Sequence, residues 1–328
     1  MRVCRIRDKI FPIGWYALAE KRKISFVIPV YNSEKTIRKV VEGIVGTVNA
    51  TYPNDDYEIV LVNDGSHDSS WETLESIHKD IANTSIINLS KNFGQANATL
   101  AGLNSAIGDF VIGLDDDMQT PPEEFPKLLE CLLESDYDAV YARYRDKKHS
   151  TIQNFGSRIN NSMSTTLAGK PKGIRSSSFY CIKKYVVDEI IKYDYPYPYL
   201  PGLVFRVTDN VGNCFVEHRF RENGKSNYTI GRLLRLWLNG FTGFSILPLR
   251  ISVVFGMIFS IAAFVVAIIL IINKLLNPGI ALGWTSTVVL ILMVGGIQLL
   301  CIGLLGEYVG RSYININKSP QYIIKDKK

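Results

Sequence analysis

Short apolar runs alternate with polar turns and amphipathic stretches through the first part of the chain. Residues 24–30 form a nearly continuous run of β-branched and aromatic side chains, and residues 37–48 then place apolar side chains at helical spacing. Residues 57–62 open a second unit of the same kind, with a helical pattern from about Ser70. A strand, a polar turn and a helix in this order are typical of the βα unit of a parallel sheet.

Two further hydrophobic runs, residues 85–89 and 109–114, predict two more strands. Strands this hydrophobic are buried on both faces, so helices must cover the sheet on both sides. The soluble region is therefore predicted to have an α/β fold with a mostly parallel, Rossmann-like sheet. In such open sheets ligands bind where the carboxyl ends of the strands meet, so polar residues at those ends are the first functional candidates.

The last part of the chain carries two long uncharged stretches. Residues 251–272 are 22 residues without a charge, and residues 282–306 are 25 more. Each exceeds the roughly 20 apolar residues that cross a bilayer as a helix. We therefore expect two transmembrane helices. The linker 273–281 holds a single charge whereas Lys and Arg residues flank the outer ends, which predicts that both termini are cytoplasmic.

An amphipathic stretch precedes the first expected span. Apolar side chains from Ile230 to Phe244 recur at helical spacing, and Arg232 and Arg235 lie off that stripe. The pattern favours an interfacial helix, with a helix packed on the globular domain as the alternative. The predicted organisation is an N-terminal extension 1–23, a cytoplasmic globular domain 24–226, an interfacial region 227–250, two transmembrane helices within 251–306 and a cytoplasmic basic tail 307–328.

Composition narrows the class of protein. A chain with 47% hydrophobic and 21% charged residues and a net charge of +6 is not disordered, collagen-like or a small disulfide scaffold. Its positive charge gathers near the membrane ends, which argues against a nucleic-acid partner. The first 23 residues lack an uninterrupted apolar run, which argues against a secretory signal peptide. The five Cys show no CxxC pair, which argues against structural zinc.

Polar side chains cluster where the predicted strands end. Asp115, Asp116 and Asp117 follow one buried strand, while Asp64 and Lys91 follow two others. Three carboxylates so close repel one another unless a cation or solvent intervenes, and hard oxygen ligands suit Mg²⁺ or Mn²⁺. A solvated acidic turn is the alternative for the triplet taken alone. With Asp64 and Lys91 nearby, the pattern favours a divalent cation that bridges a diphosphate.

Six ordered segments resemble the motifs of membrane-anchored family 2 glycosyltransferases of the polyprenyl-phosphate type. These include dolichol-phosphate mannose synthases and the bacterial undecaprenyl-phosphate (bactoprenol) glucosyl and aminoarabinosyl transferases. The likeness runs from Ile24 to the end of the chain and leaves residues 1–23 outside it. It implies a GT-A fold with a catalytic domain at 24–226. The segments are IPVYNSE (28–34), VNDGSHDSS (62–70), LSKNFGQ (89–95), DDDMQTPPE (115–123), RENGKSNY (221–228) and GEYVGRSY (306–313).

The resemblance implies a role for each matched position. The acid triplet and Arg221 would be catalytic, and Asp117 and Gln119 would bind the metal. Pro29 and Tyr31 can also serve merely to shape a turn, and Lys225 to be a solvated interfacial charge. The residues expected at the nucleotide are Pro29, Tyr31, Asn32, Glu34, Asp64, Lys91 and Asp115, and those expected at the acceptor phosphate are Arg143, Arg175, Arg221, Lys225 and Ser226.

The implied activity is an inverting, metal-dependent transfer of one sugar, glucose or another hexose, from a UDP-sugar to undecaprenyl phosphate. The product would be a polyprenyl-monophosphate sugar for modification of cell-envelope glycans such as lipopolysaccharide. The implied setting is the cytoplasmic face of a bacterial inner membrane, with a multi-pass chain that forms a homo-oligomer such as a tetramer. Alternatives are a pseudo-transferase that acts as a membrane scaffold and a transferase onto another acceptor.

One departure from the family pattern bears on the chemistry. Relatives typically show Asp-Phe-Arg where this chain has Ser178, Phe179 and Tyr180. An acid often proposed as the base, and an arginine that could hold phosphate, are therefore both absent. A phosphate oxygen is already ionised near neutral pH and needs little or no base, unlike a sugar hydroxyl. The departure is thus compatible with transfer to a phosphate.

Overall fold

The computed structural model describes residues 21–144, 171, 173–195, 198–217, 283–316 and 320–328, together with single residues between 253 and 276. The chain divides into two compact units. One unit comprises residues 1–228 and 318–328, and the other comprises residues 229–317. The first unit contains the described sheet and the predicted strand-end residues.

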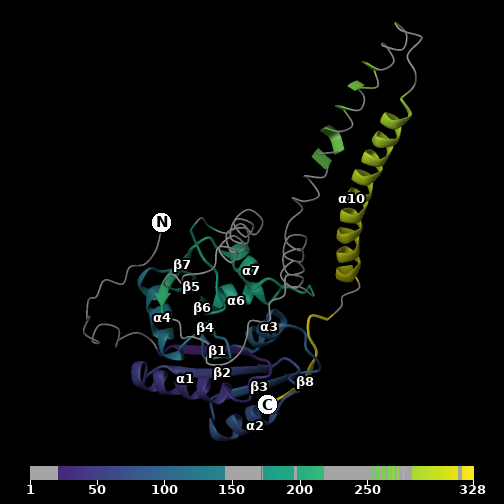
Figure 1. Ribbon diagram of the computed structural model, residues 1–328. Helices are drawn as coiled ribbons and strands as arrows, with labels where there is room; N and C mark the ends of the chain where they lie inside the picture. Colours follow the sequence, from purple (N-terminus) through teal and green to yellow (C-terminus); the bar gives the residue numbers. More distant parts are fainter. Residues whose placement is uncertain are drawn as a thin grey trace. The chain divides into compact units, whose positions relative to one another are not determined.

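An eight-stranded sheet forms the centre of the first unit, with the strand order β7-β5-β6-β4-β1-β2-β3-β8 (Figure 1). The pairs β1–β2, β1–β4, β2–β3 and β5–β7 are parallel, whereas β4–β6, β5–β6 and β3–β8 are antiparallel. The strands are β1 (Lys23–Val30), β2 (Asp56–Asn63), β3 (Thr84–Leu89), β4 (Phe110–Gly113), β5 (Ala139–Tyr144), β6 (Tyr180–Lys183), β7 (Val211–Val216) and β8 (Ile324–Lys327).

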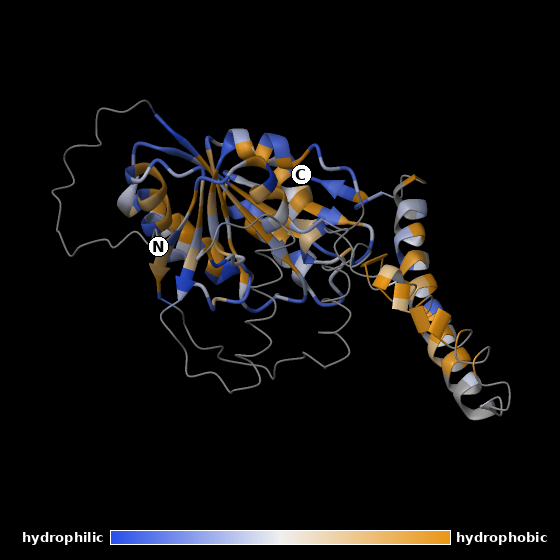
Figure 2. Ribbon diagram, turned by 90° about the horizontal axis from the view of Figure 1, so that it is seen from above, coloured by the Kyte–Doolittle hydropathy of each residue, from blue (hydrophilic) through white to orange (hydrophobic). Residues whose placement is uncertain are grey.

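Helices cover both faces of this sheet. One apolar cluster joins the sheet to α1, α2 and α4, and a second joins the opposite face to α3, α6 and α7. Figure 2 shows the central strands in the orange of hydrophobic residues, as burial on both faces requires. The predicted α/β fold is confirmed. The helices are α1 (Ile37–Thr51), α2 (Ser70–Asp80), α3 (Gln95–Ser105), α4 (Phe125–Glu134), α6 (Lys184–Ile190) and α7 (Leu200–Val207), and Pro122–Glu124 form a 3₁₀ turn, η1.

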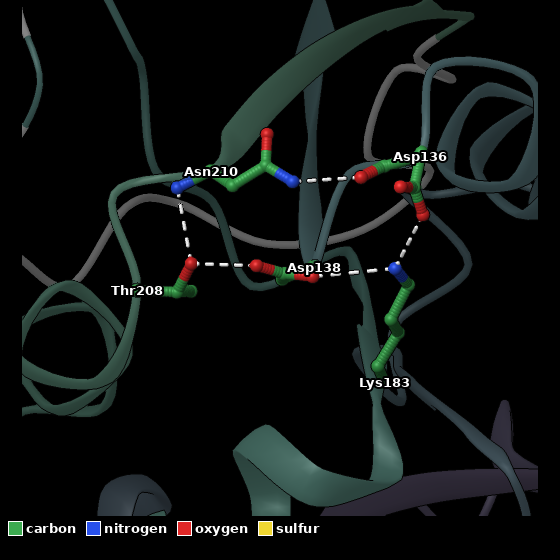
Figure 3. A network of polar contacts seen from close by, with 5 residues as sticks. All are labelled: Asp136, Asp138, Lys183, Thr208 and Asn210. Atoms are coloured by element: carbon green, nitrogen blue, oxygen red, sulfur yellow. Dashed lines mark hydrogen bonds and ion pairs between the residues drawn. The ribbon is translucent and has the colours of Figure 1, made fainter.

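A network of polar side chains connects the starts of β5 and β7 to the end of β6 (Figure 3). Lys183 Nζ lies 2.8 Å from Asp136 Oδ1 and 3.2 Å from Asp138 Oδ1. Thr208 Oγ1 donates to Asp138 Oδ2 at 2.7 Å, and Asn210 Nδ2 donates to the Asp136 carbonyl at 2.7 Å. These contacts fix the register of β5, β6 and β7 at the edge opposite to the acid triplet.

A short strand late in the chain completes the sheet. β8 pairs antiparallel with β3, in the register Ile87 to Lys327 and Asn88 to Asp326. Its four residues, IKDK, are all exposed, so hydropathy alone did not predict a strand there. Within the region expected to be a basic tail, residues 324–327 are thus part of the sheet.

The second unit contains one long apolar helix, α10 (Trp284–Ile316). Its segment Met293–Gly310 is long and apolar enough to cross a membrane, and it is the one such segment among the described residues. The span was expected at 282–306, but the helix continues to Ile316. The charged Glu307 ends the apolar run without ending the helix, because a charged side chain leaves the backbone hydrogen bonds intact.

Several segments of the predicted organisation are described only in part or not at all. Between 253 and 276, each residue that the structure describes is helical, within and just beyond the expected first span 251–272. The interfacial region 227–250 and the extension up to residue 20 lie outside the described residues, as do Arg221, Lys225 and Ser226. β1 begins at Lys23, one residue before the expected start of the globular domain.

Candidate active site

The loops after β1 and β2 interlock at the carboxyl edge of the sheet. Asn32 adopts φ 54°, a left-handed conformation that Asn tolerates better than most residues. Its backbone N–H donates to Ser66 Oγ at 3.0 Å, and its side-chain oxygen accepts from the His67 N–H at 2.9 Å. The exposed ring of Tyr31 lies edge-on to His67, with 6.5 Å between the ring centroids. Asn32 therefore links the two loops by hydrogen bonds, and the Tyr31 ring lies beside His67 of the second loop.

Glu34 and Pro29 have local structural roles at this edge. Glu34 Oε2 accepts from the Ser69 N–H at 3.1 Å, next to the first turn of α2. A carboxylate is favourable there because the N-terminus of a helix carries partial positive charge. Pro29 lies beyond Val27, the last β1 residue paired with β4. A proline, which lacks an N–H, is tolerated at this position because pairing with β4 has ended, although Pro29 still lies opposite Val62 of β2.

Asp64 holds the loop that follows β3. Its carboxylate is 2% exposed and accepts from Phe93 N–H at 2.7 Å and from Gly94 N–H at 3.0 Å. Burial raises the pKa of Asp64, and the two backbone hydrogen bonds oppose the rise. The loop also packs closely on Gly65, where an added Cβ would lie 2.5 Å from Asn92 N. Asp64 thus fixes the position of residues 90–94 at the predicted nucleotide site.

Asp116 binds the loop after β1. Its Oδ2 accepts from the Tyr31 N–H at 2.9 Å and from the Ser33 hydroxyl, and its carbonyl accepts from Thr36 Oγ1 at 2.6 Å. Burial raises the pKa of Asp116 to about 6, although these hydrogen bonds to the carboxylate oppose the rise. The middle acid of the triplet is therefore engaged in shaping the first loop.

Asp115 points to other partners. Gln95 Nε2, from the start of α3, donates to Asp115 Oδ1 at 2.8 Å, and the Ser178 hydroxyl donates to Asp115 Oδ2. Burial raises the pKa of Asp115, the Ser178 hydrogen bond lowers it, and the nearby Asp117 charge raises it. Gln95 was not among the predicted site residues. Its place in the LSKNFGQ segment, directly after a strand and at the start of a helix, was the available signal.

Asp117 and Gln119 lie together at the end of the acidic loop. Asp117 accepts from the Gln119 N–H at 3.1 Å and from Gln119 Nε2 at 2.6 Å, across Met118 with φ 59°. Together they offer carboxylate and amide oxygens, the donor type that Mg²⁺ and Mn²⁺ prefer. Among the described residues no group of three His, Cys, Asp or Glu side chains could hold a metal by itself. The donor set fits an ion completed by substrate phosphate oxygens and water.

Comparison with known proteins decides the family. The model of glycosyl transferase family 2 matches residues 25–191. The undecaprenyl-phosphate 4-deoxy-4-formamido-L-arabinose transferase of Proteus mirabilis is 33% identical over 92% of this chain and 93% of that protein. The protein of the same name from Photorhabdus laumondii is 32% identical over 93% of this chain and 94% of that protein. The chain belongs to glycosyltransferase family 2.

Solved structures support the fold of this glycosyltransferase. Glucosyl-3-phosphoglycerate synthase from Mycobacterium tuberculosis, in complex with Mn²⁺, UDP-glucose and phosphoglyceric acid, superposes with a TM-score of 0.55. The sequence identity is 18%, and the match covers 73% of this chain and 85% of that chain. At this identity the likeness shows the fold, a GT-A-like α/β domain with a mostly parallel sheet. The predicted enzyme class and the predicted polyprenyl-phosphate group of family 2 are confirmed.

Three of the basic residues predicted to bind phosphate or nucleotide, Lys91, Arg143 and Arg175, are among the described residues. Lys91 Nζ is 5.2 Å from the Phe93 ring centroid, and the Arg143 guanidinium carbon is 5.1 Å from that of Phe215. Arg175 is fixed through its backbone, whose N–H donates to Asn213 Oδ1 at 2.8 Å. Cation–π contacts of this kind leave the charged group able to bind an anion as well.

The segment that departs from the family pattern is divided between the site and the core. Ser178 contacts Asp115, whereas Tyr180 is 2% exposed and packs in the apolar cluster on the α3 face. A Cβ added to Gly113 on the neighbouring strand would lie 2.2 Å from Tyr180 Cζ, so the ring fills the space beside that glycine. The phosphate-holding role proposed for an arginine at this position is thus unavailable to Tyr180.

Thr120, which follows the acidic loop, has a structural partner. The residue is 3% exposed, and its hydroxyl lies 3.2 Å from the Tyr144 hydroxyl at the end of β5. Burial raises the pKa of Tyr144, so the phenol stays protonated and can donate this hydrogen bond. The Thr120–Tyr144 contact connects the acidic loop to β5.

Proposed function

We propose that this glycosyltransferase transfers a single sugar from a UDP-sugar to undecaprenyl phosphate, with inversion at the anomeric carbon. The observation that carries the proposal is the match over 92% of the chain to an undecaprenyl-phosphate sugar transferase, together with the acids gathered at the carboxyl edge of the sheet. The acceptor phosphate oxygen attacks the anomeric carbon, and the bond to the nucleoside diphosphate breaks. The products are a polyprenyl-monophosphate sugar and UDP.

The nature of the sugar is the least constrained part of the proposal. The sequence favoured glucose or another hexose, whereas the curated relatives are named for 4-deoxy-4-formamido-L-arabinose. We infer that the relatives' sugar is the first donor to test, with UDP-glucose second. Pro29, Tyr31, Asn32, Glu34, Asp64, Lys91 and Asp115 remain the proposed nucleotide-binding set.

Asp117 and Gln119 are the proposed ligands of Mg²⁺ or Mn²⁺. When bound, such an ion would neutralise the diphosphate of the donor and of the departing UDP. The protein itself holds Asp115 between Gln95 and Ser178, and holds Asp116 against the first loop. These contacts position the acidic loop before substrate arrives, which lowers the cost of reorganisation during the reaction.

The acceptor side of the proposal rests on chemistry that needs no strong base. Ser178 replaces the acid of related enzymes, and its hydroxyl donates a hydrogen bond to Asp115. An acceptor that is already anionic can still react, because a phosphate monoester is ionised near neutral pH. Arg143, Arg175, Arg221, Lys225 and Ser226 are the proposed phosphate-binding residues, and Arg221 is also proposed to assist catalysis together with the acid triplet.

The membrane setting of the proposal follows from the acceptor, whose head group lies at the bilayer surface. α10 would cross the inner membrane, and residues 251–272 would form a second span. The catalytic unit and both ends of the chain would then be cytoplasmic. An amphipathic helix at 227–250 would lie in the interface beside the acceptor, and the chain would act as a homo-oligomer.

A donor screen tests the proposal. Purified protein in detergent is supplied with Mg²⁺ or Mn²⁺, undecaprenyl phosphate and a panel of UDP- and GDP-sugars, and lipid-linked product is followed by mass spectrometry. One active UDP-sugar establishes the reaction and the sugar together. Metal-dependent UDP binding without product indicates another acceptor. Absence of UDP binding overturns the proposal in favour of a scaffold.

A further inference from the structure

The segment 320–328 is anchored on the catalytic unit through side chains as well as through β8. Gln321 Nε2 donates to the carbonyls of Tyr193, at 2.6 Å, and Tyr195, at 2.8 Å. The Tyr322 hydroxyl accepts from Asn104 Nδ2 of α3 at 3.0 Å. The Lys328 ammonium pairs with Glu75 of α2. Contacts with the loop at 193–195, with α3 and with α2 therefore hold the segment in a defined position on the catalytic unit.

The same segment supports the end of β3 that leads into the nucleotide loop. Ser90 N–H donates to the Ile323 carbonyl at 2.9 Å, directly before residues 91–94. At the other end of β3, Ile86 N–H donates to the Lys328 carbonyl, and Lys328 N–H donates back, each at 2.9 Å. Without the segment, β3 would be an edge strand with these groups open to water. Figure 1 shows β8 in this place beside β3.

A short path joins this pairing to Asp64. The chain leaves Ser90, and within four residues the N–H groups of Phe93 and Gly94 donate to the Asp64 carboxylate. Those two hydrogen bonds set the orientation of the carboxylate proposed to hold the nucleotide. The position of Ser90 therefore limits where Phe93 and Gly94 can place their donors.

Burial indicates that the segment does more for this loop than for the core. Tyr322 is partly buried and packs against the apolar cluster on the α3 face, whereas Ile323 is 48% exposed, Ile324 is 41% exposed and all four residues of β8 are exposed. Apart from Tyr322, the segment therefore gains little hydrophobic free energy when it binds the sheet, because that free energy scales with the apolar area removed from water. Its backbone hydrogen bonds, in contrast, act directly on the strand that carries the nucleotide loop.

We propose that the segment 320–328 is a positioning element of the nucleotide site. It holds the end of β3 so that residues 90–94 keep Asp64 in the orientation that binds the donor nucleotide. The inference rests on the proposed function, since it assigns Asp64 to the nucleotide.

Removal of residues 321–328 from the otherwise full-length protein tests the proposal. UDP affinity in the presence of Mn²⁺, measured by calorimetry, should weaken about tenfold, which corresponds to about 1.4 kcal/mol. With an active donor the KM should rise similarly while kcat stays within about twofold, since uniform binding is lost. A synthetic peptide of residues 320–328, added in trans, should restore affinity by pairing with the open edge of β3.

Two variants keep the test decisive if the shortened chain does not fold. Gln321→Ala combined with Tyr322→Phe removes two side-chain anchors and should weaken UDP binding in the same direction. Lys325→Ala changes one exposed side chain of the same strand and should leave binding unchanged. Unaltered UDP affinity in a folded shortened or doubly substituted protein overturns the inference. Lack of UDP binding by the unmodified protein overturns the proposed function instead.

Discussion

The Ser178 hydroxyl donates a hydrogen bond to Asp115 across 63 positions of sequence. With Gln95 on its other oxygen, Asp115 is held by donors from two separate elements. A hydroxyl at position 178 satisfies a carboxylate that burial disfavours in its charged form. The residue that replaces the family's acid is thus a partner of the acid triplet, and its chemistry can be tested by substitution.

Ser178→Asp should reduce turnover more than Ser178→Ala. The aspartate would restore the family's acid but place a second carboxylate against Asp115, where like charges repel. We expect a loss of about tenfold or more for Ser178→Asp and of about two- to fivefold for Ser178→Ala, which removes one hydrogen bond of about 1 kcal/mol. Initial rates with a saturating acceptor give the comparison. Higher activity in Ser178→Asp than in the unmodified enzyme would show that a base at this position is useful and would contradict the assignment.

Asp117→Ala should abolish metal-dependent turnover. The substitution removes the carboxylate proposed to bind the cation and leaves Gln119 without its partner. Losses of about 100-fold or more are typical when a group that stabilises the developing charge is removed. Titration of rate against Mn²⁺ provides the measurement, and Glu123→Gln, on the turn that follows, serves as the matched control. Retention of full activity by Asp117→Ala would show that Asp117 is not a required ligand of the metal ion.

The fold and the site differ in how far the sequence predicted them. The runs 24–30, 57–62, 85–89 and 109–114 became β1 to β4, because a strand buried on both faces must be hydrophobic throughout. β8 was not predicted, because the strand is held by backbone pairing with β3. Such pairing leaves no hydropathy pattern in the sequence IKDK.

Long-range contacts explain what was missed at the site. The acids and Asp64 were predicted to lie at one edge because the carboxyl ends of parallel strands meet there. Gln95 and Ser178 were not predicted to meet Asp115, because their partnership depends on how α3 and the start of β6 pack. The same holds for Tyr180, whose burial beside Gly113 follows from the antiparallel pairing of β4 and β6.

The network around Asp138 should make the folding stability of the protein depend on pH in the acidic range. Burial raises the pKa of Asp138, but hydrogen bonds from Thr208, Tyr185 and Lys183 outweigh it and hold the pKa below its ordinary value. A carboxyl whose pKa is lower in the folded state stabilises the fold above its unfolded pKa, and that stability is lost as the pH falls through the folded pKa. Melting temperature measured against pH, for the unmodified protein and Asp138→Asn, tests this. The variant should be less stable near neutral pH and should lose less stability on acidification; identical profiles would rule the network out as the source.

Asp64→Asn should weaken nucleotide binding although the side chain keeps its size. The carboxylate accepts from Phe93 N–H with one oxygen and from Gly94 N–H with the other. An amide offers one acceptor and places an NH₂ group against the second donor, so one backbone N–H loses its partner at a cost of about 1–3 kcal/mol. We expect UDP affinity in the presence of Mn²⁺ to fall about tenfold or more, and Asp64→Ala to fall at least as far. Asp68 also accepts from backbone N–H groups in the interlocked loops, those of Glu34 and Ser70, so Asp68→Asn controls for a general loss of stability. Equal UDP affinity in all three variants and the unmodified enzyme would remove Asp64 from the nucleotide site.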